Sequence, residues 1–274
     1  MPWCPGPDGS DIWYETCGNG PALVLLHGWC MSSEVWKPLA ERLSTRFRVI
    51  MPDFPGHGRS PSLGRADYVL WAEYAELLGN HLGLNAAVLA GWSMGGQAAM
   101  KIAADGNRRW KSLVLICSTA CFCSTADVTW GLLTAEIAGM AKRLQRDVHR
   151  ALNDFRQLML PAAMQNDTGM RDLLGAWLGS VPFPDAATAL DGLESLAKSD
   201  LRMMVPAIRI PTLVISGADD RICPAQASQW ISDAISGSRH VTISGCGHAP
   251  LMTEPDYMAR LIIESVSGQT VRDA

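Results

Sequence analysis

Short continuous apolar runs alternate with amphipathic segments along most of this chain. Runs of this kind are typical of strands that are covered on both faces, as in a parallel sheet. The first predicted strand lies at residues 11–16. Continuous apolar runs lie at residues 22–26, 86–90 and 113–117, and further strands are predicted at residues 47–51, 212–216 and 240–243.

Helical spacing of apolar residues fills most of the segments between these strands. Ser32-Ser33-Glu34 is a start signal for a helix that we expect to end near Leu43. Further helices are predicted at residues 68–82, from Met94 onward, at 225–235 and at 254–266. Strands that alternate with helices predict an α/β fold with a mostly parallel central sheet flanked by helices.

The stretch from residue 120 to residue 200 breaks this alternation. It has helical patterns and no clear strand. We therefore expect a core formed by residues 1–119 and 201–274. Residues 120–200 are expected to form a helical cap, or lid, inserted in this core and lying over the strand ends.

The segment Gly91-Trp92-Ser93-Met94-Gly95 has the G-x-S-x-G pattern, preceded by a strand and followed by an Ala-rich helix. In that setting the serine lies on a sharp turn with its hydroxyl exposed above the sheet, and the flanking positions pass too close to other backbone for a side chain. Ser93 is therefore the candidate nucleophile.

A serine hydroxyl needs a base to accept its proton, and the base needs a group that orients it. His248, in a Gly-rich loop after the last strand, is the candidate base. Two acids, Asp219 and Asp220, follow the strand before it. We favour Asp220 as the orienting acid, while Asp219 serves as a cap for the loop or the next helix.

An oxyanion hole requires two backbone N–H groups near the nucleophile. The residue after the nucleophile, Met94, is expected to supply one, and Trp29, in the loop after the strand at 22–26, the other. The alternative for Trp29 is a role in packing alone. His27 is expected to brace this loop by hydrogen bonds rather than to act as a base.

The expected cap contains a long helical pattern at residues 141–159. Its apolar stripe is formed by Leu144, Val148, Leu152, Phe155 and Met159, and its basic residues include Lys142, Arg146 and Arg150, with Arg143 and Arg156 nearby. This basic face suggests a local anionic partner, and the alternative is an ordinary solvated helix face.

Composition excludes several classes of function. The 274 residues are 48% hydrophobic, enough for a full core, and the net charge of −4 argues against a nucleic-acid partner. No apolar run approaches the roughly 20 residues that span a bilayer, and no secretion signal precedes the first strand. The eight cysteines lack zinc-site spacing. We expect a cytoplasmic monomer with reduced thiols, no metal and no cofactor.

Several motifs in combination are more specific than the serine turn alone. With the order Ser, Asp, His, the chain resembles the α/β-hydrolase superfamily. Within it, the chain resembles the pimeloyl-[acyl-carrier protein] methyl ester esterases of biotin synthesis. The segments that carry this resemblance are Leu26-His27-Gly28-Trp29, Glu34-Val35-Trp36, residues 53–60, residues 91–96, Gly192-Leu193-Glu194, Asp200-Leu201-Arg202 and His248-Ala249-Pro250.

The resemblance implies a serine carboxylesterase that hydrolyses the methyl ester of pimeloyl bound to acyl carrier protein and releases methanol. It implies substrate contacts at Trp29, Ser93, Met94, His248 and the segment from Phe155 to Met159. It also implies that arginines of the cap hold the phosphate-bearing arm of the carrier. Here the matching residues are Arg150 and Arg171, with Arg146 as a third.

Two other functions remain open from the residues. One is a general carboxylesterase or lactonase that acts on free small molecules. The other, from a different class, is a hydrolase-like protein that binds a ligand without turning it over, although such a protein has no need of a complete Ser, Asp and His set.

Overall fold

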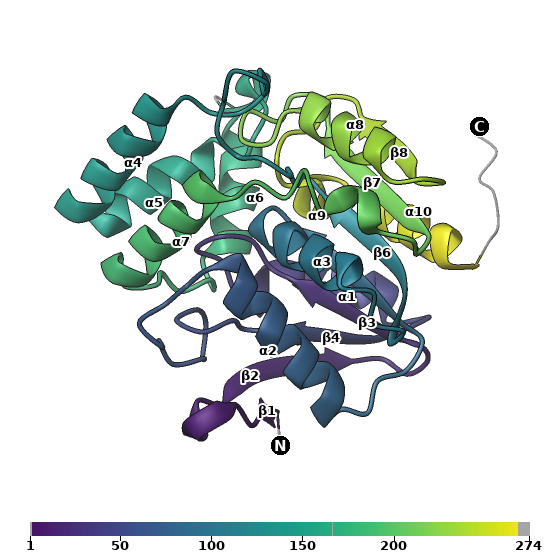
Figure 1. The fold of residues 1–274 in the computed structure, drawn as a ribbon. Coiled ribbons are helices and arrows are strands. Elements are labelled where there is room, and N and C mark those ends of the chain that lie inside the picture. The colour runs from purple at the N-terminus through teal and green to yellow at the C-terminus, as the bar shows by residue number, and fades with distance from the viewer. Residues whose placement is uncertain (1, 166, 268–274) are drawn as a thin grey trace.

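The computed structural model describes residues 2–165 and 167–267. Its described part is built on an eight-stranded sheet in the order β1-β2-β4-β3-β5-β6-β7-β8 (Figure 1). β1 and β2 are antiparallel at one edge, and the strands from β4 to β8 in this order are parallel. This confirms the predicted α/β class. The strands are β1 (Trp3–Cys4), β2 (Ile12–Cys17), β3 (Ala22–Leu26), β4 (Arg48–Pro52), β5 (Ala87–Trp92), β6 (Trp110–Ile116), β7 (Thr212–Gly217) and β8 (Arg239–Ile243).

Helices cover both faces of the sheet. α2 (Tyr68–His81), α3 (Met94–Ala104) and α8 (Ala225–Ala234) lie on the face toward the viewer of Figure 1, and α1 (Lys37–Leu43) and α10 (Pro255–Ser267) pack together behind it. The short α9 (Pro250–Thr253) precedes α10. Single 3₁₀ turns lie at η1 (Pro7–Gly9), η2 (Ser33–Trp36), η3 (Ala162–Met164) and η4 (Val205–Ala207).

The local sequence explains where these elements begin. Asp67 precedes α2, and its carboxylate accepts the backbone N–H groups of Val69 and Leu70, which have no partner inside the helix. Ser32 caps the helical segment after β3, as predicted. That segment begins as the 3₁₀ turn η2 and continues as α1. β1 was not predicted, because two residues are too few for any periodicity.

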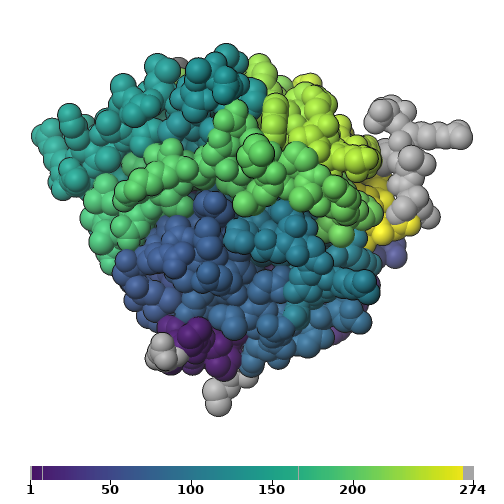
Figure 2. Space-filling view, viewed as in Figure 1, coloured from purple at the N-terminus to yellow at the C-terminus, as the bar shows by residue number. Residues whose placement is uncertain are grey.

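Within the described residues, four α-helices lie between β6 and β7, and we call this group the helical insertion. They are α4 (Thr134–Arg146), α5 (Val148–Gln157), α6 (Thr168–Leu178) and α7 (Ala186–Lys198). Figure 1 shows them gathered at one end of the sheet, and in Figure 2 the green α7 region lies as a band between the teal insertion and the blue α2 and α3. In the part of the chain that the structure describes, no helix has both the length and the apolar character needed to cross a membrane.

The single helix predicted at residues 141–159 is wrong: the structure has two helices there, α4 and α5. Asp147 between them has extended backbone (φ −161°, ψ 95°), and its carboxylate accepts the N–H of Arg150 at 3.0 Å. Aspartate competes with the helix for backbone N–H groups, so it favours a new N-cap over continuation of α4. The apolar stripe is continuous in sequence but divided between two helices.

Arg156 is also placed differently from the prediction. The sequence put it near a solvated basic face, whereas the structure leaves only 6% of it exposed. Its guanidinium donates to the carbonyl oxygens of Leu178, the last residue of α6, and of Val181, and it lies 4.0 Å from the ring centroid of Phe183. Burial lowers the pKa of Arg156 to about 10, and the side chain joins α5 to α6.

Candidate active site

Ser93 lies at the sharp turn between β5 and α3. Its backbone has φ 56° and ψ −121°, a left-handed φ that non-glycine residues rarely adopt. The turn is held by its own neighbours: the N–H of Ser93 donates to Ile116 at 3.0 Å, and the hydroxyl of Ser118 donates to the carbonyl of Ser93 at 2.8 Å. Only 7% of Ser93 is exposed. A strained, braced serine at this position matches the setting expected of a nucleophile.

The glycines around Ser93 are required by close approach of backbone. A Cβ at Gly95 would lie 2.3 Å from the carbonyl oxygen of Leu26, and one at Gly28 would lie 3.1 Å from the Cβ of Ser93. These contacts place the loop after β3 directly against the serine turn. The sequence thus specifies glycine where the two segments touch.

His248 is paired with Asp220 beneath this turn. The Nδ1 of His248 lies 2.8 Å from the Oδ2 of Asp220, and both side chains are at most 1% exposed. The second oxygen of Asp220 accepts the N–H groups of Ile222 and Cys223 at 2.8 and 2.9 Å. Because the carboxylate is fixed by backbone on one side, it orients the imidazole on the other.

Asp219 has a different position. It is exposed, and its described contact is a hydrogen bond from its own N–H to the carbonyl of Cys246 at 2.9 Å. The structure therefore brings Asp220, and not Asp219, to His248.

Two backbone contacts fix the loop that carries His248. The indole Nε1 of Trp92 donates to the carbonyl oxygen of His248 at 2.7 Å, and the N–H of His248 donates to the carbonyl of Met159 at 2.9 Å. Trp92 lies beside Ser93, and Met159 lies two residues after the end of α5. The position of His248 thus depends on the serine turn and on the helical insertion together.

Two N–H groups near Ser93 are free to bind an oxyanion. Met94 is the first residue of α3, so its N–H has no acceptor within that helix. The N–H of Trp29 donates no hydrogen bond within residues 2–165 and 167–267. Gly28, next to Trp29, is in contact distance of Ser93, as described above. These are the two residues expected from the sequence to form the oxyanion hole.

The side chain of Trp29 is fixed as well. Its Nε1 donates to the carbonyl of Ala189 in α7 at 2.9 Å, and its ring meets Phe155 edge to face with centroids 4.9 Å apart. It packs so closely against α7 that a Cβ at Gly192 would lie 2.6 Å from it. Packing and a role for the backbone N–H are therefore compatible in the same residue.

His27 braces the same loop. Its Nε2 accepts the N–H of Phe54 at 3.1 Å, so its Nδ1 carries the proton and donates to the carbonyl of Gly28 at 2.9 Å. Complete burial lowers the pKa of His27 to about 4, and burial next to His27 lowers the pKa of His57 to about 3. Both imidazoles are neutral near pH 7, and His27 has no free nitrogen to act as a base.

A mostly apolar cavity of about 170 Å³ opens above Ser93. Trp29, Ser93 and Phe155 are among the residues that line it. Three charged residues, Glu136, Arg143 and Arg221, also line it. The remaining lining residues are apolar: Phe122, Leu132, Ile137, Met140, Leu158, Leu193, Leu196 and Ile222.

The cavity divides the residues predicted to bind substrate. Trp29, Ser93 and Phe155 line it, whereas Met94, Met159 and His248 are buried around it and do not. The predicted carrier residues are all exposed and lie outside its lining: Arg146, Arg150 and Arg171. Sequence reasoning missed Arg143 and Arg221 as cavity residues. For Arg221 the only signal was its position beside Asp220.

One cluster with metal-ligand chemistry lies within the described residues. Ligand atoms of Cys117, Asp220 and His248 lie within 4.8 Å of one another. Burial raises the pKa of the Cys117 thiol well above its usual value, so it is protonated, and the other two side chains bind each other. A protonated thiol is a poor metal ligand. The eight cysteines, all in the described segments, are unpaired.

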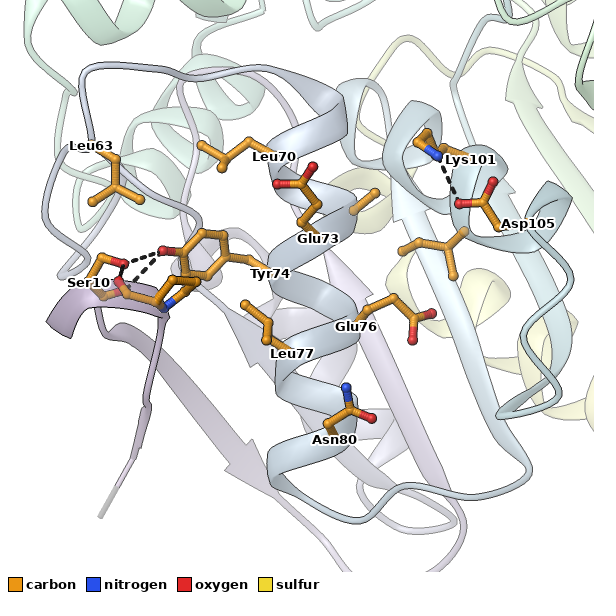
Figure 3. A pocket seen from close by; sticks show the side chains of 13 residues that line it. Ser10, Leu63, Leu70, Glu73, Tyr74, Glu76, Leu77, Asn80, Lys101 and Asp105 are labelled. Carbon is orange, nitrogen blue, oxygen red and sulfur yellow. Dashed lines mark hydrogen bonds and ion pairs between the residues drawn. The ribbon is translucent and has the colours of Figure 1, made fainter.

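A larger hollow of about 790 Å³ lies on the outer side of α2 and α3 (Figure 3). In its wall Tyr74 contacts Ser10, and Lys101 is paired with Asp105 at 2.8 Å. None of its lining residues belongs to the Ser93, Asp220 and His248 set. Size alone therefore does not identify the functional cavity of this protein.

Comparison with known proteins places these features in context. Residues 21–255 match the family of the alpha/beta hydrolase fold. A pimeloyl-[acyl-carrier protein] methyl ester esterase of Nitrosomonas europaea is 37% identical over 249 residues, which is 90% of this chain and 96% of that protein. The protein of the same name from Yersinia pseudotuberculosis is 33% identical over 253 residues, covering 92% and 95%.

Solved structures of esterases have the same fold. The esterase EaEST from Exiguobacterium antarcticum superposes with a TM-score of 0.88 at 23% identity, over 97% of this chain and 98% of that chain. A thermophilic esterase from Thermogutta terrifontis has a TM-score of 0.82 at 26% identity, over 96% of both chains.

Proposed function

Because the chain belongs to the α/β-hydrolase family, and within it to the pimeloyl-[acyl-carrier protein] methyl ester esterases, we propose that Ser93, His248 and Asp220 form the catalytic triad of a serine esterase. The membership confirms the family predicted from the motifs. The observation that carries the triad is the buried His248–Asp220 pair of 2.8 Å beside the strained turn of Ser93.

Acylation begins at the hydroxyl of Ser93. Its Oγ attacks the ester carbonyl carbon while Nε2 of His248 takes the hydroxyl proton, and Asp220 stabilises the resulting imidazolium. The N–H groups of Trp29 and Met94 donate to the oxyanion of the tetrahedral intermediate. When that intermediate collapses, His248 returns the proton to the departing methoxide, and methanol leaves.

Deacylation repeats these steps with water. His248 takes a proton from a water molecule, whose oxygen attacks the acyl-Ser93 carbonyl, and the proton then goes to Oγ of Ser93. The products are the free carboxylic acid and the original hydroxyl. The Nδ1 of His248 stays bound to Asp220 throughout, so the imidazole keeps its orientation.

The substrate we propose is the methyl ester of pimeloyl bound to acyl carrier protein. The apolar wall of the cavity above Ser93 supports a methylene chain as the acyl group. Residues 120–200 act as a cap over this cavity, since Phe122, Met140, Phe155 and Leu193 in its wall all come from that segment. We propose that the enzyme works in the cytoplasm as a monomer.

The exposed arginines of the insertion are the proposed contacts for the carrier. Arg146 at the end of α4, Arg150 in α5 and Arg171 in α6 lie outside the cavity, where a bulky acidic partner can reach them. Surface cations of this kind attract an acidic protein and orient it before the acyl chain enters.

The first experiment compares three esters at equal enzyme concentration. These are methyl pimeloyl-acyl-carrier protein, free dimethyl pimelate and p-nitrophenyl butyrate. A higher kcat/KM on the carrier-linked ester supports the carrier as substrate. Equal or higher values on the free esters contradict it and identify a general carboxylesterase.

Two sets of variants separate catalysis from carrier recognition. Ser93→Ala is expected to lower kcat on all three esters by several orders of magnitude, and retained activity would contradict the triad. Arg146→Glu with Arg150→Glu is expected to weaken turnover of the carrier-linked ester only. Equal losses on p-nitrophenyl butyrate would contradict carrier binding at these residues.

A further inference from the structure

Gln97 is a completely buried polar side chain in α3, the helix that begins directly after Ser93. It follows Ser93 by about one helical turn. Its Nε2 donates to the carbonyl oxygen of Thr119 at 3.1 Å and to the hydroxyl of Ser199 at 2.9 Å. Because a carbonyl oxygen can only accept, the NH₂ end of the amide has to face these two partners.

The two partners of Gln97 lie on the two connections that join the helical insertion to the sheet. Thr119 lies three residues after β6, and Ser199 directly follows α7. The connections also bond to each other, since the N–H of Leu201 donates to the carbonyl of Ala120 at 2.7 Å. Gln97 therefore binds the insertion at the place where both of its connections meet the core.

Each partner is linked in turn to a residue of the cavity above the serine turn. The hydroxyl of Ser199 donates to the carbonyl of Leu196 at 2.8 Å, and Leu196 lines the cavity. The hydroxyl of Thr119 donates to the carbonyl of Cys121 at 2.7 Å, directly before Phe122, which also lines the cavity. One amide group thus reaches two residues of the cavity wall, one at each end of the insertion, by short hydrogen-bond paths.

The other end of the amide has no such role. In the residues that the structure describes, Oε1 of Gln97 has no hydrogen-bond partner. A buried oxygen without a partner destabilises the folded state relative to an apolar side chain of similar size. A leucine at this position would avoid that cost but could not bind Thr119 and Ser199, so the two donated bonds are what distinguishes the glutamine.

We infer that Gln97 is a positioning residue that sets acyl-chain specificity, because it holds Phe122 and Leu196 in place relative to Ser93. The inference rests on the proposed esterase function and concerns a residue outside the cavity lining. A short acyl group needs little of the cavity wall, whereas each methylene of a longer chain gains about fourfold from burial against it. Displacement of the wall therefore weakens long-chain esters selectively.

Two esters with the same leaving group measure this selectivity. They are p-nitrophenyl hexanoate and p-nitrophenyl acetate, which differ by four methylenes. Gln97→Leu removes both donated bonds, and we expect the hexanoate-to-acetate ratio of kcat/KM to fall by about tenfold, with kcat/KM on the acetate within about twofold of wild type. An unchanged ratio, or an equal loss on both esters, would overturn the inference.

A second variant tests the same path from its other end. Ser199→Ala removes one acceptor of Gln97 and the bond to Leu196, and is expected to lower the ratio by about threefold. Because both changes break the same bond, the double variant is expected to lose less than the product of the two single losses. Independent losses would overturn the shared path.

The matched control is Gln229→Leu. Gln229 is a glutamine of α8 that donates to Asp233 at 2.8 Å and lies outside the cavity lining. This variant is expected to keep the wild-type ratio, and a fall as large as that of Gln97→Leu would overturn the specific role of Gln97.

Binding to inactive protein keeps this test separate from catalysis. By calorimetry, methyl hexanoate is expected to bind Ser93→Ala protein about tenfold more tightly than protein that also carries Gln97→Leu. Equal binding would overturn the positioning role while leaving the esterase intact. Weaker binding in the double variant, with no ester hydrolysed by wild-type protein, would support the positioning role and contradict the esterase instead.

Discussion

The indole nitrogen of Trp92 donates a 2.7 Å hydrogen bond to the backbone carbonyl of His248. Trp92 immediately precedes Ser93, the proposed nucleophile, and the rings of Trp92 and His248 lie with their centroids 5.4 Å apart. This side chain on β5 therefore links the serine turn to the loop that carries His248, although Trp92 and His248 are 156 positions apart in the chain.

Replacing Trp92 with phenylalanine removes this hydrogen bond and keeps an aromatic ring. We expect kcat on p-nitrophenyl butyrate to fall on the order of tenfold to hundredfold, because a small displacement of the base disturbs proton transfer. The control is Trp130→Phe, since Nε1 of Trp130 has no hydrogen-bond partner in the described structure. Unchanged kcat in Trp92→Phe would show that other contacts suffice to place His248.

Exchange of aspartate for asparagine distinguishes the two acids after β7. Asp220→Asn is expected to lower kcat by about 10⁴-fold, because an amide no longer holds the imidazole in the required tautomer. Asp219→Asn, at the exposed neighbouring position, is expected to change kcat less than about twofold. Steady-state kinetics on dimethyl pimelate provide the measurement, and a larger loss in Asp219→Asn would reverse the assignment.

Two glycine-to-alanine changes test the close approach at the serine turn. Gly95→Ala places a methyl group 2.3 Å from the carbonyl oxygen of Leu26, so we expect unfolding free energy to fall by about 1–3 kcal/mol or more. The control is Gly175→Ala in α6, where nothing lies within 4 Å of the new Cβ. There helix propensity predicts a gain of about 0.5–1 kcal/mol. Urea unfolding measures both, and equal effects would contradict the steric argument.

The buried histidines predict how stability depends on pH. Burial lowers the pKa of His27 to about 4 and that of His57 to about 3, below the ordinary value of 6.5. At a pH between the ordinary pKa and the lowered pKa of each histidine, the unfolded chain binds a proton that the folded chain does not. Acid therefore favours unfolding. The free energy of unfolding therefore falls as the pH drops below 6.5, by about 1.4 kcal/mol per pH unit for each histidine. The fall ends near pH 4 for His27 and near pH 3 for His57.

Urea unfolding between pH 7 and pH 4 measures this dependence. Replacing His57 with glutamine is expected to reduce the slope, whereas His81→Gln, at an exposed position, is expected to leave it unchanged. An identical slope in His57→Gln would show that His57 is not responsible for the acid sensitivity.

Much of the core follows from local patterns. Apolar runs predict β3, β4, β5 and β7 within one or two residues and β6 within three, because strands buried on both faces tolerate few polar side chains. The turn around Ser93 is equally local, since its glycines are dictated by backbone contacts within and beside the turn. β1 escaped detection because its two residues pair with β2 across an intervening loop.

The helical insertion was harder to predict than the core. A continuous apolar stripe suggested one helix at residues 141–159, but Asp147 caps a new helix and turns the chain there. The burial of Arg156 could not be anticipated either, since its acceptors lie at and just after the end of α6, more than 20 residues further along the chain. Periodicity describes a single helix and contains no information about its partner.

The sequence by itself determined the α/β fold, the serine turn and the family, because each depends on residues that are neighbours in the chain. Only the tertiary structure decided between Asp219 and Asp220, since that choice depends on which carboxylate reaches His248 from a separate loop. It also placed Arg143 and Arg221 at one cavity. Sites of this kind form where distant segments pack together, and packing is a property of the folded chain rather than of any local pattern.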